Sequence, residues 1–251
     1  MTDTDDPHAD EPQAMAGARA APGWAHQHRD VAGGWLRPTV FGAMDGLVTN
    51  ASLIVGVGGS GVAVHTLLLT GFAGLAAGSL SMAAGEYISV TSQNELTHAE
   101  TALERDKIAA FPDAEREELT ETLTRYGLDP ALATQAATAI SARPDTALRM
   151  HTREELGVDH EHLPSAWLAA GASLLAFALG AAIPLLPYLA GARTLLGSLI
   201  LFGVALFGGG ATVGVMTQRP ALRSGTRQLL LGAFAAAVTF GIGRLIGTSL
   251  A

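Results

Sequence analysis

Long apolar stretches alternate with polar ones along the 251 residues of this chain. Five of the apolar stretches are long enough for a helix to cross roughly 30 Å of hydrocarbon. They cover residues 38–59, 64–90, 165–186, 194–216 and 228–250. A short glycine-rich link joins the first two stretches and makes them an antiparallel hairpin. The pattern therefore predicts an all-α, polytopic membrane protein with five transmembrane helices.

One long polar stretch, residues 91–163, separates the second apolar stretch from the third. The second helix is expected to continue into it from Glu95 to Lys107, because no Pro or Gly stops it there. Three short amphipathic helices follow, and bundling would bury their apolar faces. We predict them over residues 114–126, 130–142 and 144–156.

Punctuating residues support these bounds. Asp113 is a candidate N-cap, and Gly127 and Gly157 are candidate stops. The run from Pro184 to Pro187 predicts a stop after the third transmembrane helix. The expected domains are transmembrane helices 1–2 over 35–90, a helical insertion over 91–163 and transmembrane helices 3–5 over 164–251.

Residues 1–34 are acidic and rich in Pro, Ala and Gly, so we expect a disordered cytosolic tail. The tail lacks the basic and then apolar pattern of a signal peptide. Its three histidines, His8, His26 and His28, offer possible metal ligands, but a solvated tail is the favoured interpretation.

Composition agrees with a membrane protein that carries one soluble insertion. Only 15% of residues are charged, against about 25% in ordinary soluble domains. Of the 23 acidic residues, 15 lie between Thr91 and Leu163, and none lies after Pro164. The absence of cysteine excludes disulfides and thiolate metal sites. The net charge of −8 argues against nucleic acid and favours cationic partners. An enzyme is not expected, because no catalytic triad or phosphate loop is visible.

Arginines set the expected orientation in the membrane. Four of them flank the helices on one side, namely Arg37, Arg219, Arg223 and Arg227. The positive-inside rule places the N-terminus, the insertion and the 218–227 loop in the cytosol and the C-terminus outside. Arg193 alone falls on the other side. Arg244 lies inside the fifth helix, where it either snorkels to the outer surface or pairs with a carboxylate.

Three residues within the first two apolar stretches carry candidate chemistry. A carboxylate in hydrocarbon costs roughly 2.5–3.5 kcal/mol, so Asp45 is functional by default. Met82 and Glu86 are four residues apart and share one face of the second helix. A carboxylate with a thioether suits a transition metal such as Fe²⁺ better than Mg²⁺ or Ca²⁺. The alternatives are ordinary packing for Met82 and a cap or ion pair for Glu86.

The insertion contains further candidate metal ligands on separate helices. They are Glu100 and Glu104, then Glu115 and Glu118, and finally His151 with Glu154 and Glu155. Carboxylates on different helices can converge on a divalent cation, and a bound cation would relieve the repulsion of like charges four residues apart. The alternative is a solvated acidic face. Residues 159–162 are interpreted as a linker with weak metal affinity at most.

Four segments resemble the vacuolar iron transporter family, and the resemblance covers residues 36–250. They read DGLVTNASLIVGV, AAGSLSMAAGEYISVTSQNE, REELGV and IPLLPY. The resemblance implies a five-helix fold whose second helix extends into a cytosolic metal-binding domain. It also implies a homodimer with a pathway lined by the first helices of both protomers. Members of the family export Fe²⁺, and often Mn²⁺, from the cytosol in exchange for protons.

The resemblance assigns roles to individual residues. It places the pathway aspartate at Asp45 and the pathway methionine at Met82, and it places glutamates of the cytosolic metal site at Glu104, Glu115, Glu118 and Glu155. Three features depart from the family pattern. Gly74 stands where eukaryotic members carry a glutamate, Lys107 stands at a metal-site glutamate, and His151 with Thr152 stands at paired methionines.

These departures leave several interpretations open. Lys107 would make the site bind fewer ions or bind them more weakly, with His151 as a replacement ligand, and Glu86 would take part of the role of the missing glutamate. Other transported or bound ions are Mn²⁺, Zn²⁺ or a broader divalent range. A non-transporting membrane metal sensor or scaffold is the alternative from another class. The Ala-, Gly- and Leu-rich composition favours a bacterial plasma membrane.

Overall fold

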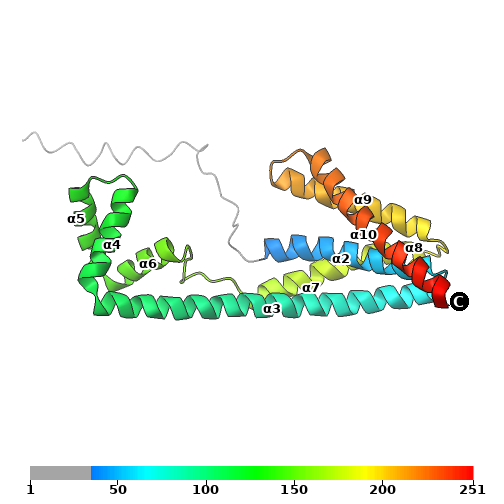
Figure 1. The fold of residues 1–251 in the computed structure, drawn as a ribbon, viewed down its shortest axis with the longest axis horizontal. Coiled ribbons are helices and arrows are strands. Elements are labelled where there is room, and N and C mark those ends of the chain that lie inside the picture. Colours follow the sequence, from blue (N-terminus) through cyan, green and yellow to red (C-terminus); the bar gives the residue numbers. More distant parts are fainter. Residues whose placement is uncertain (1–34, 251) are drawn as a thin grey trace, which may run out of the picture. The chain divides into compact units, whose positions relative to one another are not determined.

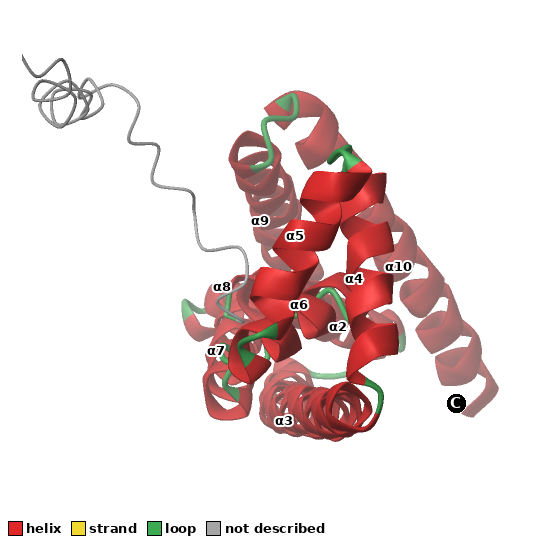
Figure 2. Cartoon of the chain, turned by 90° about the vertical axis from the view of Figure 1, so that its left-hand side faces the viewer, coloured by secondary structure: helices red, strands yellow, loops and turns green. Residues whose placement is uncertain are grey.

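The computed structural model describes residues 35–250, with side chains through Gly247. The predicted tail over 1–34 and its three histidines lie outside the described residues, as does Ala251. Helices and loops make up all of the described part of the chain (Figure 2). The all-α prediction is therefore confirmed.

Five helices are long and apolar enough to cross a membrane, as the hydrophobic pattern predicts. They are α2 (Leu36–Gly59), α3 (Val64–Ala110), α7 (Ala166–Ala182) with its extension, α9 (Leu195–Met216) and α10 (Ala221–Leu250). The extension of α7 is the 3-10 turn η1 (Ile183–Leu185) followed by α8 (Leu186–Leu189). The helix α3 runs unbroken for 47 residues, so the second apolar stretch does continue into the polar one.

The helix α2 packs against α3, α7, α9 and α10 (Figure 1). Glycine permits the closest approach, because a β-carbon on Gly46 would overlap the backbone carbonyl of Phe177 on α7. In the same way, a β-carbon on Gly180 would overlap the carbonyl of Ala43. Small residues at helix contacts allow close packing in lipid. Phe177 and Leu47 are almost fully buried at this contact.

Replacing Gly46 with alanine is expected to lower the Tm of the purified chain. The added methyl group meets backbone rather than a flexible side chain, so α2 and α7 must separate, and overpacking of this kind costs about 1–3 kcal/mol. Gly171→Ala on α7 is the matched control, since nothing lies within 4 Å of its β-carbon position. An unchanged Tm in Gly46→Ala, measured by the same thermal scan, would contradict this packing.

Three short helices follow α3, namely α4 (Pro112–Arg125), α5 (Pro130–Ser141) and α6 (Pro144–Glu155). Their common core contains Leu119 and Leu123 from α4 and Ala133 and Ala137 from α5. The carboxylate of Asp129 caps α5 by accepting a hydrogen bond from the backbone N–H of Ala131 at 2.9 Å. Figure 2 looks along α3 and shows the three short helices together on one side of it.

Two predicted stops in this region have the backbone conformation that only glycine adopts readily. Gly127 has a φ of 93° and Gly157 a φ of 66°, both in the left-handed region. Gly127 follows the end of α4, and Gly157 follows the end of α6. Local turn chemistry was thus sufficient to predict both helix ends.

Three predicted boundaries are wrong. Asp113 is not an N-cap, because Pro112 already occupies the first turn of α4 and Asp113 forms an ion pair with Arg116 at 2.9 Å. The Pro184–Pro187 run does not stop the third membrane-length helix, because helical structure continues from α7 through η1 and α8 to Leu189. The helix α10 begins at Ala221 rather than at residue 228, so two of the loop arginines lie in its first turns.

The ends of the long helices fall into two groups. Figure 1 shows that α2 begins, α9 ends and α10 begins at the end of the helix bundle from which α3 continues towards α4. The link between α2 and α3 lies at the opposite end, with Gly61 in a left-handed turn. The α9–α10 turn and the short helices therefore lie towards the same end of the bundle.

Candidate metal centre

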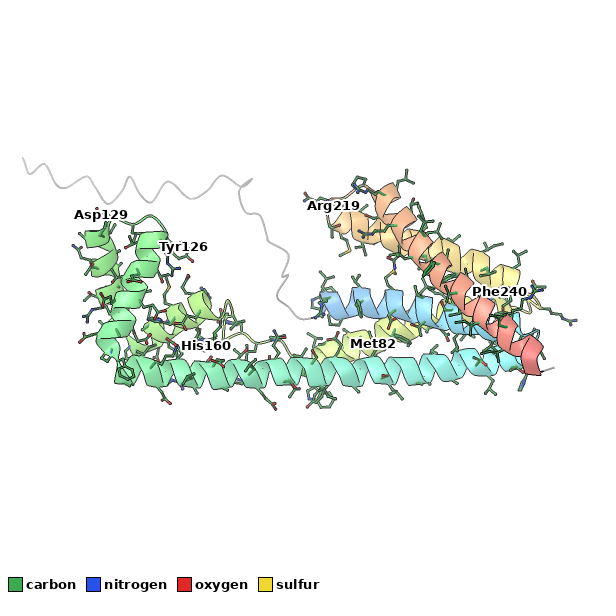
Figure 3. All side chains as sticks on the ribbon, viewed as in Figure 1. Met82, Tyr126, Asp129, His160, Arg219 and Phe240 are labelled. Carbon is green, nitrogen blue, oxygen red and sulfur yellow. The ribbon has the colours of Figure 1, made fainter. Side chains whose placement is uncertain are left out.

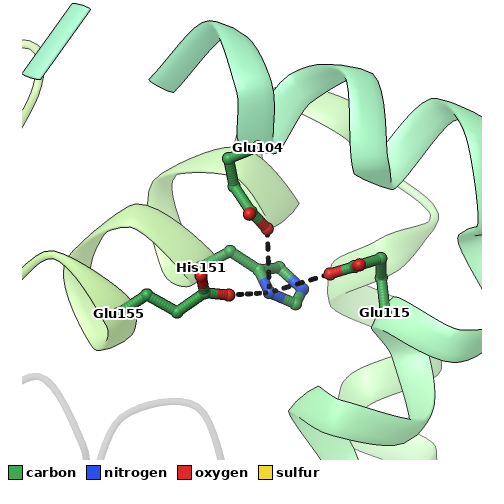
Figure 4. A group of neighbouring side chains, drawn as sticks. All are labelled: Glu104, Glu115, His151 and Glu155. Atoms are coloured by element: carbon green, nitrogen blue, oxygen red, sulfur yellow. Dashed lines mark ion pairs between the residues drawn. The ribbon is translucent and has the colours of Figure 1, made fainter. Parts of the chain in front are cut away.

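Four ligand-type side chains from three helices meet beside the end of α3. Glu104 comes from the last turns of α3, Glu115 from the first turn of α4, and His151 and Glu155 from one face of α6. An acidic residue in a first turn is favoured by the helix dipole, and residues four apart on a helix lie side by side. Local structure thus aims each side chain, and the packing of α3, α4 and α6 brings them together (Figure 4).

His151 lies at the centre of the group. Its Nδ1 atom is 3.5 Å from Oε1 of Glu104, 3.6 Å from Oε2 of Glu115 and 3.5 Å from Oε1 of Glu155. One ligand atom from each of the four residues lies within 4.8 Å of the others. These separations are longer than good hydrogen bonds. Imidazole nitrogen together with carboxylate oxygen is a donor set that first-row divalent metals accept.

Burial makes this group unusual for an acidic cluster. The side chains of His151 and Glu104 are 4% and 5% exposed. Oε1 of Glu104 and Oε2 of Glu115 are buried and have no hydrogen-bond partner. Burial, and after it the charge of Glu104, raises the pKa of Glu115 above its ordinary value of 4.5. Buried anionic oxygens without partners are costly, so the geometry fits a bound cation better than a solvated acidic face.

Replacing Glu115 with glutamine is expected to raise the Tm of the metal-free chain. A carboxylate with a raised pKa favours the folded state at low pH, and that contribution is lost as the pH rises through the raised value. The stability gain of Glu115→Gln should therefore be absent near pH 4.5 and grow towards pH 8. Its expected size is roughly 2–4 °C, which corresponds to about 1 kcal/mol in a chain of this size.

Thermal scans of the metal-free protein at several pH values check this expectation. Glu117→Gln on the exposed face of α4 is the matched control and should leave the pH profile unchanged. A Glu115→Gln variant that is less stable than the parent at pH 8 would contradict the assigned burial cost.

Lys107 contacts the far side of the same cluster. Its Nζ atom is 3.1 Å from Oε2 of Glu104 and 3.8 Å from Oε2 of Glu155. These two carboxylates therefore face His151 through one oxygen and Lys107 through the other. The lysine is 44% exposed, so it offsets part of the negative charge from the solvent side. The positive charge expected among the ligands is indeed adjacent to them.

Not every predicted ligand of the insertion joins this cluster. Glu100 on α3 and Glu118 on α4 are exposed and lie outside the group. Met150 packs against the Leu119 and Leu123 core rather than towards His151. The hydroxyl of Thr152 donates to the carbonyl of Leu148 on its own helix at 2.8 Å.

A second acidic group, Asp159, Glu161 and His162, follows α6. Arginines already neutralise it, since Arg153 contacts Asp159 at 2.9 Å and Arg149 contacts Glu161 at 3.5 Å. The backbone N–H of Glu161 also holds the pKa of Asp159 below its ordinary value. This arrangement fits the interpretation of the segment as a linker.

Asp45 lies in a different environment, on α2. The hydroxyl of Thr49 donates a hydrogen bond of 3.0 Å to it. Asp45 lines a cavity of about 480 Å³ together with Arg37, Met44 and Gln228. Met82 and Glu86 are partly buried on α3, where Figure 3 labels Met82, and neither lines this cavity. Met44 and Gln228 were missed by the sequence analysis, although Met44 is the residue next to Asp45.

The space beside Gly74 on α3 is filled from α2. A β-carbon on Gly74 would lie 2.7 Å from Oδ1 of Asn50 and 2.7 Å from Cδ2 of Leu53. Asn50 is almost fully buried and donates a hydrogen bond of 2.6 Å to the carbonyl of Ala181, while its Oδ1 has no partner. A glutamate at position 74 would need both α2 side chains to move. Asn50 was also missed from the sequence.

Comparison with known proteins gives a consistent result over nearly the whole chain. The VIT family matches residues 36–244. Vacuolar iron transporter 1 of Eucalyptus grandis is 30% identical over 226 residues, which cover 88% of this chain and 91% of that protein. Vacuolar iron transporter homolog 2 of Arabidopsis thaliana is 34% identical over 219 residues, which cover 85% of each chain.

The family match and the fold agree. Vacuolar iron transporter 1 of Arabidopsis thaliana is a further relative, 30% identical over 86% of this chain and 87% of its own length. The matched region contains the five membrane-length helices and the Glu104 cluster. The chain is therefore a multi-pass membrane protein that belongs to the VIT family, a family of transporters rather than of enzymes.

Proposed function

We propose that this protein transports Fe²⁺ out of the cytosol in exchange for protons. The observation that carries the proposal is the cluster of Glu104, Glu115, His151 and Glu155, in which two buried carboxylate oxygens have no hydrogen-bond partner. The names of the relatives, all vacuolar iron transporters or their homologues, support iron as the cargo. In this scheme the cluster collects Fe²⁺ before it enters the membrane.

The proposed orientation places residues 91–163 as a metal-binding domain in the cytosol, between transmembrane helices over 35–90 and 164–251. Arg37 and the arginines of the α9–α10 turn support it through the positive-inside rule. The N-terminus would then be cytosolic and the C-terminus outside. We place the protein in a bacterial plasma membrane.

Within the membrane, Asp45 is the proposed exchange site. A carboxylate must lose its proton to bind a metal, so protons and Fe²⁺ compete for the same group. If Asp45 takes a proton from outside and Fe²⁺ from inside in turn, that competition couples the two flows. Met82 and Glu86, which share one face of α3, would form the vestibule between the cluster and Asp45.

A homodimer completes the proposal. The apolar stretch of α3 is only 17% buried within one chain. It exposes large apolar side chains such as Leu69, Phe72 and Leu80. Part of this surface can contact lipid, but a second copy would cover it as well and line a shared pathway with both α2 helices.

Other ions use the same ligands, so Mn²⁺ and Zn²⁺ are alternative cargoes. A metal sensor or scaffold that does not transport is favoured by one observation, the contact of Lys107 with two carboxylates of the cluster. Uptake into proteoliposomes under an imposed pH gradient distinguishes these alternatives. Flux driven by the gradient supports an antiporter, and the relative uptake rates of the different ions identify the transported metal. No flux of any ion supports the sensor.

Replacing Lys107 with glutamine is expected to strengthen Fe²⁺ binding at the cluster. The change removes a positive charge that competes with the metal for Glu104 and Glu155, and roughly tenfold tighter binding corresponds to about 1.4 kcal/mol. Anaerobic calorimetry on the full chain measures both the affinity and the number of ions bound. Arg116→Gln removes the same charge from the Asp113 pair and should have no effect. Weaker binding in Lys107→Gln would mean that the lysine organises the site.

A further inference from the structure

Three arginines surround a cavity at the turn between α9 and α10. The cavity has a volume of about 620 Å³, and Arg219, Arg223 and Arg227 line it. Figure 3 labels Arg219 at this turn. Arg223 and Arg227 are four residues apart on α10, so they extend from one face of the helix. A volume of this size is typical of small-molecule sites.

These arginines have no acidic partner within the described residues. No ion pair of the described chain involves any of the three, and no acidic residue occurs between Pro164 and Ala251. The three arginines are exposed and line one cavity, so an anion bound there would reduce the repulsion between their like charges. Arginine also matches the geometry of phosphate oxygens with paired N–H donors.

A serine in the lining of the cavity offers the same ligand chemistry. Ser224 lines the cavity, is only 8% exposed, and makes no side-chain hydrogen bond within the described residues. Pro220 precedes the first turn of α10, whose free backbone N–H groups carry the positive end of a 30-residue helix. The Ser224 hydroxyl can donate a hydrogen bond to an anion in the cavity, and the helix N-terminus adds a dipolar attraction to that of the three charges.

The surroundings of the cavity favour an anion that is part of a lipid. The turn joins two membrane-length helices, so it lies where a bilayer places its phosphate groups. Val215 and Met216 at the end of α9 and Leu222 at the start of α10 are exposed apolar residues, and acyl chains would cover them. Basic pockets at the ends of transmembrane helices bind anionic headgroups.

We propose that the α9–α10 cavity binds a phosphate group, held by Arg219, Arg223 and Arg227 with the hydroxyl of Ser224, and that an anionic phospholipid supplies it. This site is separate from the Glu104 cluster and from Asp45, and it does not depend on the proposed transport of iron. Bound lipid would fix the α9–α10 turn at the membrane surface.

The test uses native mass spectrometry of the full chain titrated with phosphatidylglycerol or with phosphatidylcholine. The parent protein should hold one phosphatidylglycerol at least about tenfold more tightly than phosphatidylcholine. Arg223→Gln should reduce that affinity about tenfold, the loss expected for one charge-assisted hydrogen bond. Ser224→Ala should reduce it less. Arg193→Gln, which removes an exposed arginine from the link before α9, is the matched control and should bind as the parent does.

A second arm separates lipid from free phosphate. Inorganic phosphate is titrated by calorimetry into protein in nanodiscs of phosphatidylcholine alone. Binding of inorganic phosphate that Arg223→Gln weakens, without any preference for phosphatidylglycerol, would retain the phosphate site but assign it to a soluble ligand.

The proposal is overturned by equal affinity for both lipids together with no phosphate binding. Equal loss of phosphatidylglycerol affinity in Arg223→Gln and Arg193→Gln would also overturn it, because charge anywhere on the protein would then explain the binding. Fe²⁺ binding at the Glu104 cluster should be unchanged in every variant, which shows that the chain still folds.

Discussion

Asp45→Asn is expected to reduce Fe²⁺ uptake, driven by a pH gradient, to the rate of protein-free liposomes. Asparagine has almost the shape of aspartate but carries no charge, so it cannot alternate between a proton and a metal. Met44 and Gln228, which line the same cavity as Asp45, offer only uncharged ligand atoms to a metal. The Thr49 hydroxyl, which donates to Asp45, can still donate to an amide oxygen. A loss of Fe²⁺ uptake in Asp45→Asn would therefore result from removing the negative charge and not from a change in shape or hydrogen bonding.

Two comparisons make the result specific. Asp106→Asn, an exposed carboxylate on α3, should transport as the parent does. Thr49→Ala should retain flux, since it removes one hydrogen bond and leaves the carboxylate in place. If Asp45→Asn exchanged Fe²⁺ for protons at the parent rate, the proton and metal path would not pass through Asp45. The experiment measures Fe²⁺ inside the liposomes and the collapse of the pH gradient together.

Glu104→Gln is expected to weaken Fe²⁺ binding to the purified chain by at least about tenfold, as removal of supporting groups at metal sites already does. Glu104 is the most buried carboxylate of the cluster, and its Oε1 has no hydrogen-bond partner, with His151 Nδ1 3.5 Å away. The amide keeps the volume of the side chain but removes the anion.

Glu100→Gln is the matched control for this prediction. It removes the same charge from the same face of α3 one turn earlier, at a residue that lies outside the cluster. Anaerobic calorimetry should therefore find parent-like affinity in Glu100→Gln. Equal weakening in both variants would mean that the insertion attracts metal through its overall negative charge, and the cluster would lose its special role.

The transport result and the binding result are independent of each other. If Asp45→Asn binds Fe²⁺ normally but does not transport it, the cluster binds the metal and Asp45 on α2 is required for its transport. A Glu104→Gln protein that transports at high Fe²⁺ but not at low Fe²⁺ would show that the cluster loads the pathway. Each variant thus reports on one step.

Much of the helical architecture could be read from local patterns. Runs of apolar residues predict the five long helices, and Gly127 and Gly157 predict two of the breaks. The pattern misjudged the start of α10, because the polar residues before Gln228 resemble a loop when they are read without their partners. Gly210 and Gly214 on α9 lie against the start of α10, and this packing favours a helix there.

The membership of the metal centre could be read only in part, because the candidates included all four members of the cluster but also Glu100 and Glu118, which lie outside it. His151 and Glu155 share a face of α6 and were expected together, whereas the hydroxyl of the neighbouring Thr152 donates to the backbone of its own helix. Asn50 was missed because the residues singled out in the apolar stretches were chosen for a carboxylate or thioether, and a neutral amide carries neither signal. Only the approach of α3 at Gly74 and of α7 at Ala181 makes its side chain part of the interior.

The amino-acid sequence by itself determined which segments are helical, how many can cross a membrane, and which residue types are available to bind metal, because hydropathy, helix stops and side-chain chemistry act over a few residues. The tertiary structure decided which glutamates meet. Glu100 and Glu104 lie on one face of α3 but about 6 Å apart along its axis, and only Glu104 joins the side chains from α4 and α6. The spacing of residues along one helix determines which of them share a face, whereas only the packing of other helices determines which residue on that face they contact.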